Sequence, residues 1–111
     1  MSEDDSIWDG VQVDWGGRSA PTIASQKNAE SLLRILRPLN LMPKSAGRGF
    51  WETTILSWKD PLVDIEVFDG RFELYIYPPL VSGPLFDVHE FDGGLESDLD
   101  RLLEKLKTLL N

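Results

Sequence analysis

The chain of 111 residues contains no cysteine and only one histidine, His89. Without cysteine the chain can form no disulfide, no thiolate metal site and no cysteine nucleophile. The N-terminal residues 1–5 are acidic where a secretion signal would be basic, so we predict a cytoplasmic protein. No apolar run approaches the roughly 20 residues that span a bilayer, and we expect no membrane partner.

Signatures of catalysis are also absent from the sequence. It has no phosphate-binding loop, dinucleotide fingerprint, nucleophile elbow or zinc-ligand spacing. Four potential metal ligands cluster around His89 in residues 87–92. Alternate residues of a strand point to opposite faces, so only two of these ligands share a face, and a solvated acidic edge is the simpler interpretation. We therefore expect no metal, no cofactor and no enzymatic activity.

Basic side chains are few, 11 against 19 acidic ones, which gives a net charge of −8. Residues 60–100 hold eleven acidic side chains and a single basic one, Arg71. Such a surface repels nucleic acid and anionic membranes and attracts basic partners. Most basic side chains lie within residues 18–59, but no nucleic-acid-binding motif accompanies them, so direct nucleic acid binding is not expected.

Two helices are predicted, over residues 25–36 and 97–110. Ser25 is the predicted N-cap of the first, leucine and alanine side chains recur on one face at helical spacing, and Pro38 ends it. The second carries acids at its start, bases near its end and an apolar stripe. That stripe is formed by Leu95, Leu99, Leu102, Leu103, Leu106, Leu109 and Leu110.

Strands are predicted at residues 50–58, 62–68 and 71–77, with a short fourth one at 85–91 and a basic loop at 42–49. Asp69-Gly70 between two alternating runs predicts a hairpin with a type I′ turn, in which both residues have positive φ. The pairing that follows sets Glu66 opposite Glu73 and collects the apolar side chains on one face. Those side chains are Val63, Ile65, Val67, Phe72, Leu74 and Ile76.

The predicted fold class is α+β. We expect a two-layer sandwich in which an antiparallel three- to four-stranded β-meander packs against two helices, in the order α-β-β-β-(β)-α. Residues 1–24 are interpreted as an acidic N-terminal segment with a short strand near Val11–Trp15, and residues 25–111 as a single α+β domain.

The second face of the hairpin carries the candidate partner-binding residues. Acidic and aromatic side chains together on an exposed sheet are typical of a binding surface. Three interpretations stay open: a solvated face, a partner surface, and a Mg²⁺ or catalytic site built on Asp64, Glu66 and Glu73. Alternatively, the N-terminal segment with Trp8 and Trp15 folds over this face. The candidates are Asp64, Glu66, Phe68, Glu73, Tyr75 and Tyr77.

Residues 7–77 resemble a group of small uncharacterised bacterial proteins. The resemblance lies in Trp8-Asp9-Gly10, Pro21, a leucine-rich helix, Trp58 and the Asp69-Gly70 hairpin. It implies a helix followed by a β-meander and a bacterial or phage origin. It implies no activity, cofactor or site residue.

The sequence favours a small acidic, non-catalytic protein-binding module that engages a basic surface on another protein. Inhibitors, antitoxins, immunity proteins and anti-CRISPR proteins are of this size and charge. The first alternative is a homodimeric structural or regulatory protein, because seven leucines lie within residues 95–110. The second is the Mg²⁺-dependent enzyme that uses Asp64, Glu66 and Glu73.

Overall fold

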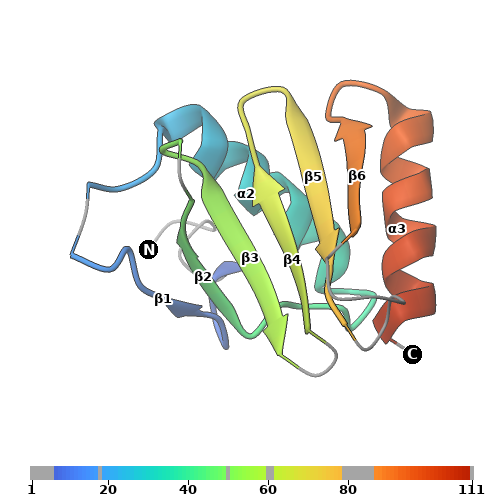
Figure 1. The fold of residues 1–111 in the computed structure, drawn as a ribbon, viewed down its shortest axis with the longest axis horizontal. Helices are drawn as coiled ribbons and strands as arrows, with labels where there is room; N and C mark the ends of the chain where they lie inside the picture. The colour runs from blue at the N-terminus through green and yellow to red at the C-terminus, as the bar shows by residue number, and fades with distance from the viewer. Residues whose placement is uncertain (1–6, 18, 50, 60–61, 79–86, 111) are drawn as a thin grey trace.

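A computed structural model describes residues 7–17, 19–49, 51–59, 62–78 and 87–110. These residues form an α+β fold with one six-stranded mixed sheet and two helices (Figure 1). In chain order the elements are β1 (Gln12–Val13), α2 (Ile23–Leu36), β2 (Ser45–Arg48), β3 (Thr54–Lys59), β4 (Leu62–Val67), β5 (Arg71–Ile76), β6 (Asp87–Asp92) and α3 (Glu96–Leu110).

The strands follow one another across the sheet in the order β1 to β6, and only the β1–β2 pair is parallel. The predicted antiparallel meander is present as β3 to β6. The prediction of three to four strands was too small, because it did not include β2 or the pairing of β1 with β2. Residues 42–49 were predicted to be a polar, basic loop, and Ser-Ala-Gly-Arg within them has little β propensity. Pairing of all four β2 residues with β3 overrides that local preference.

The hairpin of β4 and β5 has the predicted register, with Glu66 opposite Glu73 and Val63 opposite Ile76. The predicted turn type is wrong, because neither Asp69 nor Gly70 has a positive φ. Other parts of the chain hold this turn instead. Asn28 of α2 donates its side-chain amide to the carbonyls of Phe68 (3.0 Å) and Asp69 (2.5 Å), and the Gly93 N–H donates to the Gly70 carbonyl (3.0 Å).

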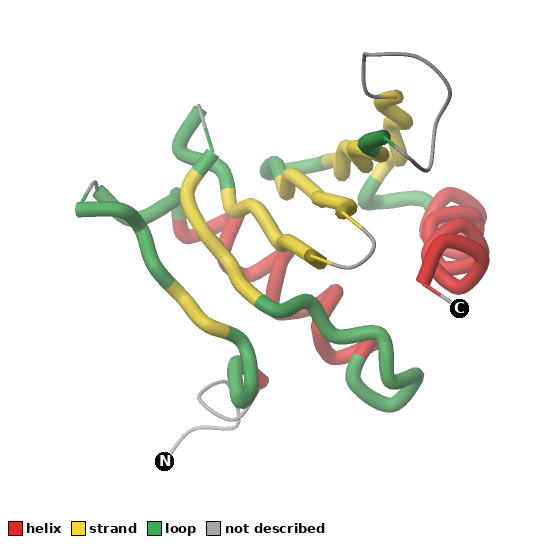
Figure 2. The backbone as a smooth tube through the Cα atoms, turned by 60° about the horizontal axis from the view of Figure 1, so that its bottom comes forward, coloured by secondary structure: helices red, strands yellow, loops and turns green. Residues whose placement is uncertain are grey.

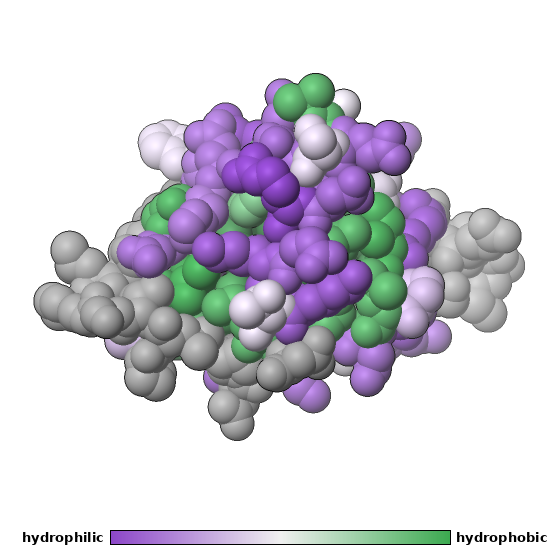
Figure 3. Space-filling view, turned by 90° about the vertical axis from the view of Figure 1, so that its right-hand side faces the viewer, coloured by the Kyte–Doolittle hydropathy of each residue, from purple (hydrophilic) through white to green (hydrophobic). Residues whose placement is uncertain are grey.

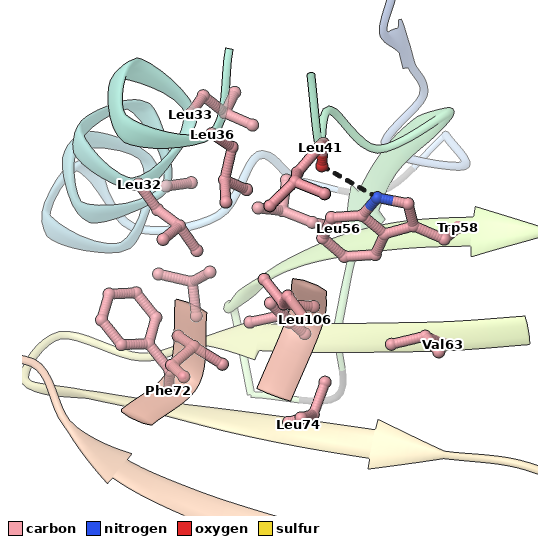
Figure 4. Close-up of a cluster of buried hydrophobic side chains, with 14 of the residues drawn as sticks. Leu32, Leu33, Leu36, Leu41, Leu56, Trp58, Val63, Phe72, Leu74 and Leu106 are labelled. Carbon is pink, nitrogen blue, oxygen red and sulfur yellow. Dashed lines mark hydrogen bonds between the residues drawn. The ribbon is translucent and has the colours of Figure 1, made fainter. Parts of the chain in front are cut away.

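The core lies between the inner face of the sheet and the helices. The helix α2 packs against β3 and β4, and α3 packs beside β6, as the tube view in Figure 2 also shows. Leu32, Leu33 and Leu36 of α2 point toward the strands (Figure 4). The Trp58 indole N–H donates to the Leu41 carbonyl at 3.0 Å, which satisfies its polar atom inside the core.

The N-terminal segment contributes to this core at its far edge. Ile7 and Val11 are buried, and β1 extends the sheet beyond β2. The Trp8 indole N–H lies 3.4 Å from Glu30 of α2, on the helical side of the molecule. The described residues of this segment therefore do not cover the outer face of β4 and β5, contrary to that alternative.

Ser25 is a buried residue of α2 and not its N-cap. Thr22 caps the helix, because its hydroxyl accepts from the Ser25 N–H at 3.1 Å. The Ser25 hydroxyl donates to the Val67 carbonyl (2.7 Å) and accepts from the Thr54 N–H (2.8 Å). Since its proton is thus used, the Thr54 hydroxyl, 2.8 Å away, is the donor of their mutual bond. One side chain therefore links α2 to β3 and β4.

The C-terminal helix begins one residue before its predicted start and uses most of its leucines internally. Leu102 and Leu106 are fully buried, and four more leucines pack partly against the core. Neither helix in the described ranges is long and apolar enough to cross a membrane.

We expect Ser25→Ala to lower the free energy of unfolding by about 1–3 kcal/mol, because it removes the hydroxyl that bonds the buried Thr54 N–H and Val67 carbonyl. Ser31→Ala is the matched control: Ser31 lies on the exposed side of the same helix, and its replacement should change stability by less than about 0.5 kcal/mol. Urea unfolding followed by circular dichroism measures both. Equal stabilities of the two variants would contradict the linking role of Ser25.

Candidate functional site

The outer face of the sheet is the candidate site, because neither α2 nor α3 lies in front of β3 to β6 in Figure 1. We call its β4–β5 part the acidic face. The hairpin register brings the predicted residues together there. Hydrogen bonds link each tyrosine to a carboxylate, and the Phe68 ring contacts Arg71. The acidic face consists of Asp64, Glu66, Phe68, Glu73, Tyr75 and Tyr77.

Glu66 and Glu73 lie opposite each other and share one tyrosine. The Tyr75 hydroxyl is 2.9 Å from Oε1 of Glu66 and 2.8 Å from Oε1 of Glu73. A phenol has a single proton, so the two carboxylates compete for the same donor. Burial, then the hydrogen bonds to Glu73 and Glu66, raise the pKa of Tyr75 well above its usual value.

Glu66 is buried, with 5% of its surface exposed, although it faces outward from the sheet. The Thr53 hydroxyl donates to its Oε2 at 2.5 Å, so both of its oxygens have a donor. The segment before β3 covers it, since a side chain on Gly49 would collide with Oγ1 of Thr53 and Oε2 of Glu66. Glu66 therefore organises the acidic face from beneath and is not available to contact a partner.

Tyr77 and Asp64 form a second pair at the other end of the acidic face. The Tyr77 hydroxyl donates to Oδ2 of Asp64 at 3.1 Å. Burial, followed by the negative charge of Asp64, raises the pKa of Tyr77 to about 12. Both tyrosines therefore stay neutral hydrogen-bond donors beyond the pH at which a free tyrosine ionises.

Arg71 places a positive charge beside the carboxylates of the acidic face. Its Nε lies 3.5 Å from Oε2 of Glu73 and 3.8 Å from Oε1 of Glu90, and its guanidinium stacks 3.8 Å from the centre of the Phe68 ring. The register places Glu90 of β6 directly beside Glu73, so three glutamates lie in a row across β4, β5 and β6. One arginine leaves this row with an excess of negative charge.

Sequence reasoning missed Thr53, Gly49 and Glu90 as parts of this site. Glu90 was noticed only in the histidine-containing strand, but its outward direction follows from alternation once β6 is paired with β5. No local signal marks Thr53 or Gly49, because their proximity to Glu66 depends on the pairing of β2 and β3 with the rest of the sheet.

The metal alternatives gain no support from the described ranges, in which no three histidine, aspartate or glutamate side chains are grouped to hold an ion. Both oxygens of Glu66 already accept hydrogen bonds. His89 and Glu90, adjacent in β6, point to opposite faces of the sheet.

Comparison of the chain with protein-family models, with curated proteins and with solved structures gives no match. The resemblance of residues 7–77 to small bacterial proteins therefore stays a prediction, and the site has to be interpreted from its own geometry.

The raised tyrosine pKa values predict a loss of stability at high pH. A group whose pKa is raised in the folded state makes its full contribution to stability below its unfolded-state pKa, about 10 for tyrosine. That contribution is lost as the pH rises through the folded-state pKa. The free energy of unfolding should fall from pH 10 to about 12. Tyr75 and Tyr77 are the only tyrosines, so tyrosinate absorbance reports them directly. Titration of either tyrosine near pH 10 in the folded protein would contradict this.

Gly49→Ala should lower the free energy of unfolding by about 1–3 kcal/mol, because the added methyl group separates the Thr53 hydroxyl from the buried Glu66 carboxylate. Gly47→Ala, two residues earlier on β2, is the control, since a methyl group there meets only the Asp14 carbonyl at 3.4 Å. Thermal unfolding of both variants tests this. If Gly47→Ala destabilised the protein as much, the effect would belong to the strand and not to the Glu66 contact.

Proposed function

We propose that this chain is a non-catalytic protein-binding module that engages a basic surface of another protein through the acidic face, in the manner of an inhibitor, antitoxin, immunity or anti-CRISPR protein. One observation carries the proposal. Both helices lie away from the outer side of β4 to β6, which is left open and carries linked carboxylates and tyrosines.

The hydrogen bonds within the acidic face favour binding. A tyrosine whose hydroxyl is held by a carboxylate loses little rotational freedom when a partner docks, which reduces the entropic penalty of association. Tyrosine also presents apolar ring surface and a polar end together, a combination enriched at interfaces. Leu62 and Val88 add exposed apolar surface beside these rings, at 46% and 48% exposure.

The excess of negative charge on the acidic face supports a basic partner. The row of Glu66, Glu73 and Glu90, with Asp64 nearby, outnumbers Arg71 and Lys59, the latter on β3 opposite Leu62. An excess of one charge speeds encounter with an oppositely charged protein and disfavours like-charged competitors. Such binding should weaken as the salt concentration rises, because salt screens interactions between exposed charges.

The homodimer alternative loses the observation that suggested it. Six of the seven leucines at residues 95–110 pack wholly or partly on the chain's own core, and Leu95 is the one with about half of its surface exposed. Viewed from the side of α3, hydrophilic side chains occupy the middle of the surface, and apolar areas appear at its sides and top (Figure 3).

The test is affinity capture from cells of the source organism with mass spectrometry, using wild type and Glu73→Lys/Glu90→Lys. We expect a basic protein that wild type retains and the variant loses, with affinity reduced about tenfold or more. The control is Glu96→Lys/Glu104→Lys, which changes the net charge equally but on α3. Glu66 is left unchanged because its replacement would disturb the fold.

Thermal unfolding must show that the variants are folded. If Glu73→Lys/Glu90→Lys is not, Glu73→Gln/Glu90→Gln takes its place, with Glu96→Gln/Glu104→Gln as control. Equal binding by wild type and the acidic-face variant would refute the proposal, as would equal loss in the α3 control.

A further inference from the structure

Trp51 differs from the other three tryptophans of the chain. Trp58 is buried and hydrogen-bonded, and Trp8 and Trp15 are partly buried. Trp51 exposes 76% of its surface. Tryptophan is the residue type most enriched among those that dominate binding energy at interfaces, and an exposed one beside a candidate binding face is a natural anchor.

The backbone around Trp51 is tied to the fold on both sides. The Gly49 N–H donates to the Thr53 carbonyl at 2.8 Å, and the Thr22 N–H donates to the Glu52 carbonyl at 2.9 Å. Glu52 has φ +61°, a left-handed conformation that few non-glycine residues adopt. Thr53 in turn binds Glu66 of the acidic face. The exposure of Trp51 is therefore set by its neighbours' hydrogen bonds.

A depression of about 250 Å³ lies next to Trp51 and is lined by residues just before β3 and by residues of the β4–β5 turn. We call it the Trp51 pocket. It continues the acidic face, because Phe68 belongs to both. Its walls include two aromatic rings, two carboxylates and one guanidinium, those of Trp51, Phe68, Glu52, Asp69 and Arg71.

The two aromatic rings of the pocket differ in whether a cation of this chain stacks on them. The guanidinium of Arg71 already stacks on Phe68 and is paired with Glu73 and Glu90. Among the described residues no cation lies over Trp51. Tryptophan is the strongest cation–π acceptor of the aromatic side chains, so its free ring and the nearby carboxylates suit a cation supplied from outside.

We infer that the basic partner inserts an arginine side chain into the Trp51 pocket, where its guanidinium stacks on Trp51 and pairs with Glu52 and Asp69. This rests on the proposed function and names the anchor of that interface. Arginine fits better than lysine, because its planar group stacks on rings and binds carboxylates through two parallel hydrogen bonds. Glu52 already forms a long ion pair with Arg48, at 3.8 Å, but its side chain is 60% exposed and remains accessible to a second guanidinium.

A peptide titration of the ¹⁵N-labelled full chain tests the inference. The probe is acetyl-Gly-Arg-Gly-Arg-Gly-amide, and its control replaces each arginine by citrulline, which has nearly the same shape but no charge. The indole N–H signals of the four tryptophans are observed, and that of Trp51 is identified with Trp51→Phe. We expect saturable movement of the Trp51 signal with the arginine peptide and none with the citrulline peptide.

Trp51→Ala should weaken binding of the arginine peptide about threefold to tenfold. It should leave stability unchanged, because the side chain is largely exposed. The matched control is Leu95→Ala, another exposed apolar side chain, on the loop before α3, which should bind as wild type does.

Each other outcome overturns the inference. A Trp51 signal that does not move, equal movement with citrulline, or unchanged affinity of Trp51→Ala would do so. Movement with protein concentration alone would show that a second copy covers the pocket. Loss of the captured partner by Glu73→Lys/Glu90→Lys but not by Trp51→Ala would leave the proposed function standing without this anchor. If both variants retained the captured partner, the proposed function and the Trp51 anchor would both be refuted.

Discussion

The register of the β4–β5 hairpin is the constraint on which the rest of the molecule depends. Side chains alternate along a strand, so this register sends Val63, Ile65 and Val67 inward and Asp64 and Glu66 outward. A slip of one residue would exchange the two sets. The inner set gives α2 and α3 a surface to cover, and the outer set becomes the acidic face.

The polar contacts of the fold serve as links between layers. Ser25 joins α2 to the two central strands from inside the core, using its donor and both acceptor positions. Glu66 does the corresponding work on the outer side, where it holds Thr53 and Tyr75. A buried carboxylate with hydrogen bonds to both oxygens avoids much of the desolvation penalty that an unpaired charge would incur. Through Thr53 the same network reaches the segment that displays Trp51.

Much of the candidate site could be predicted from the chain because it belongs to one hairpin. Asp64, Glu66, Glu73 and Tyr75 share a face by alternation alone. Their roles could not be predicted. Glu66 was predicted as a partner-binding residue, yet it is buried, with Gly49 and Thr53 against its carboxylate. Trp51 was assigned to a strand, but the left-handed Glu52 delays the start of β3 to Thr54 and leaves the indole in solvent.

The sequence by itself determined the α+β class, both helices, the central meander and the sorting of its two faces, because periodicity and turn residues act over a few neighbouring positions. Only the tertiary structure decided what long-range contacts control. The turn at Asp69-Gly70 adopts a geometry set by Asn28 and Gly93 in place of type I′, and β2 forms because β3 offers it partners. Local preferences are small, and the hydrogen bonds made on folding outweigh them.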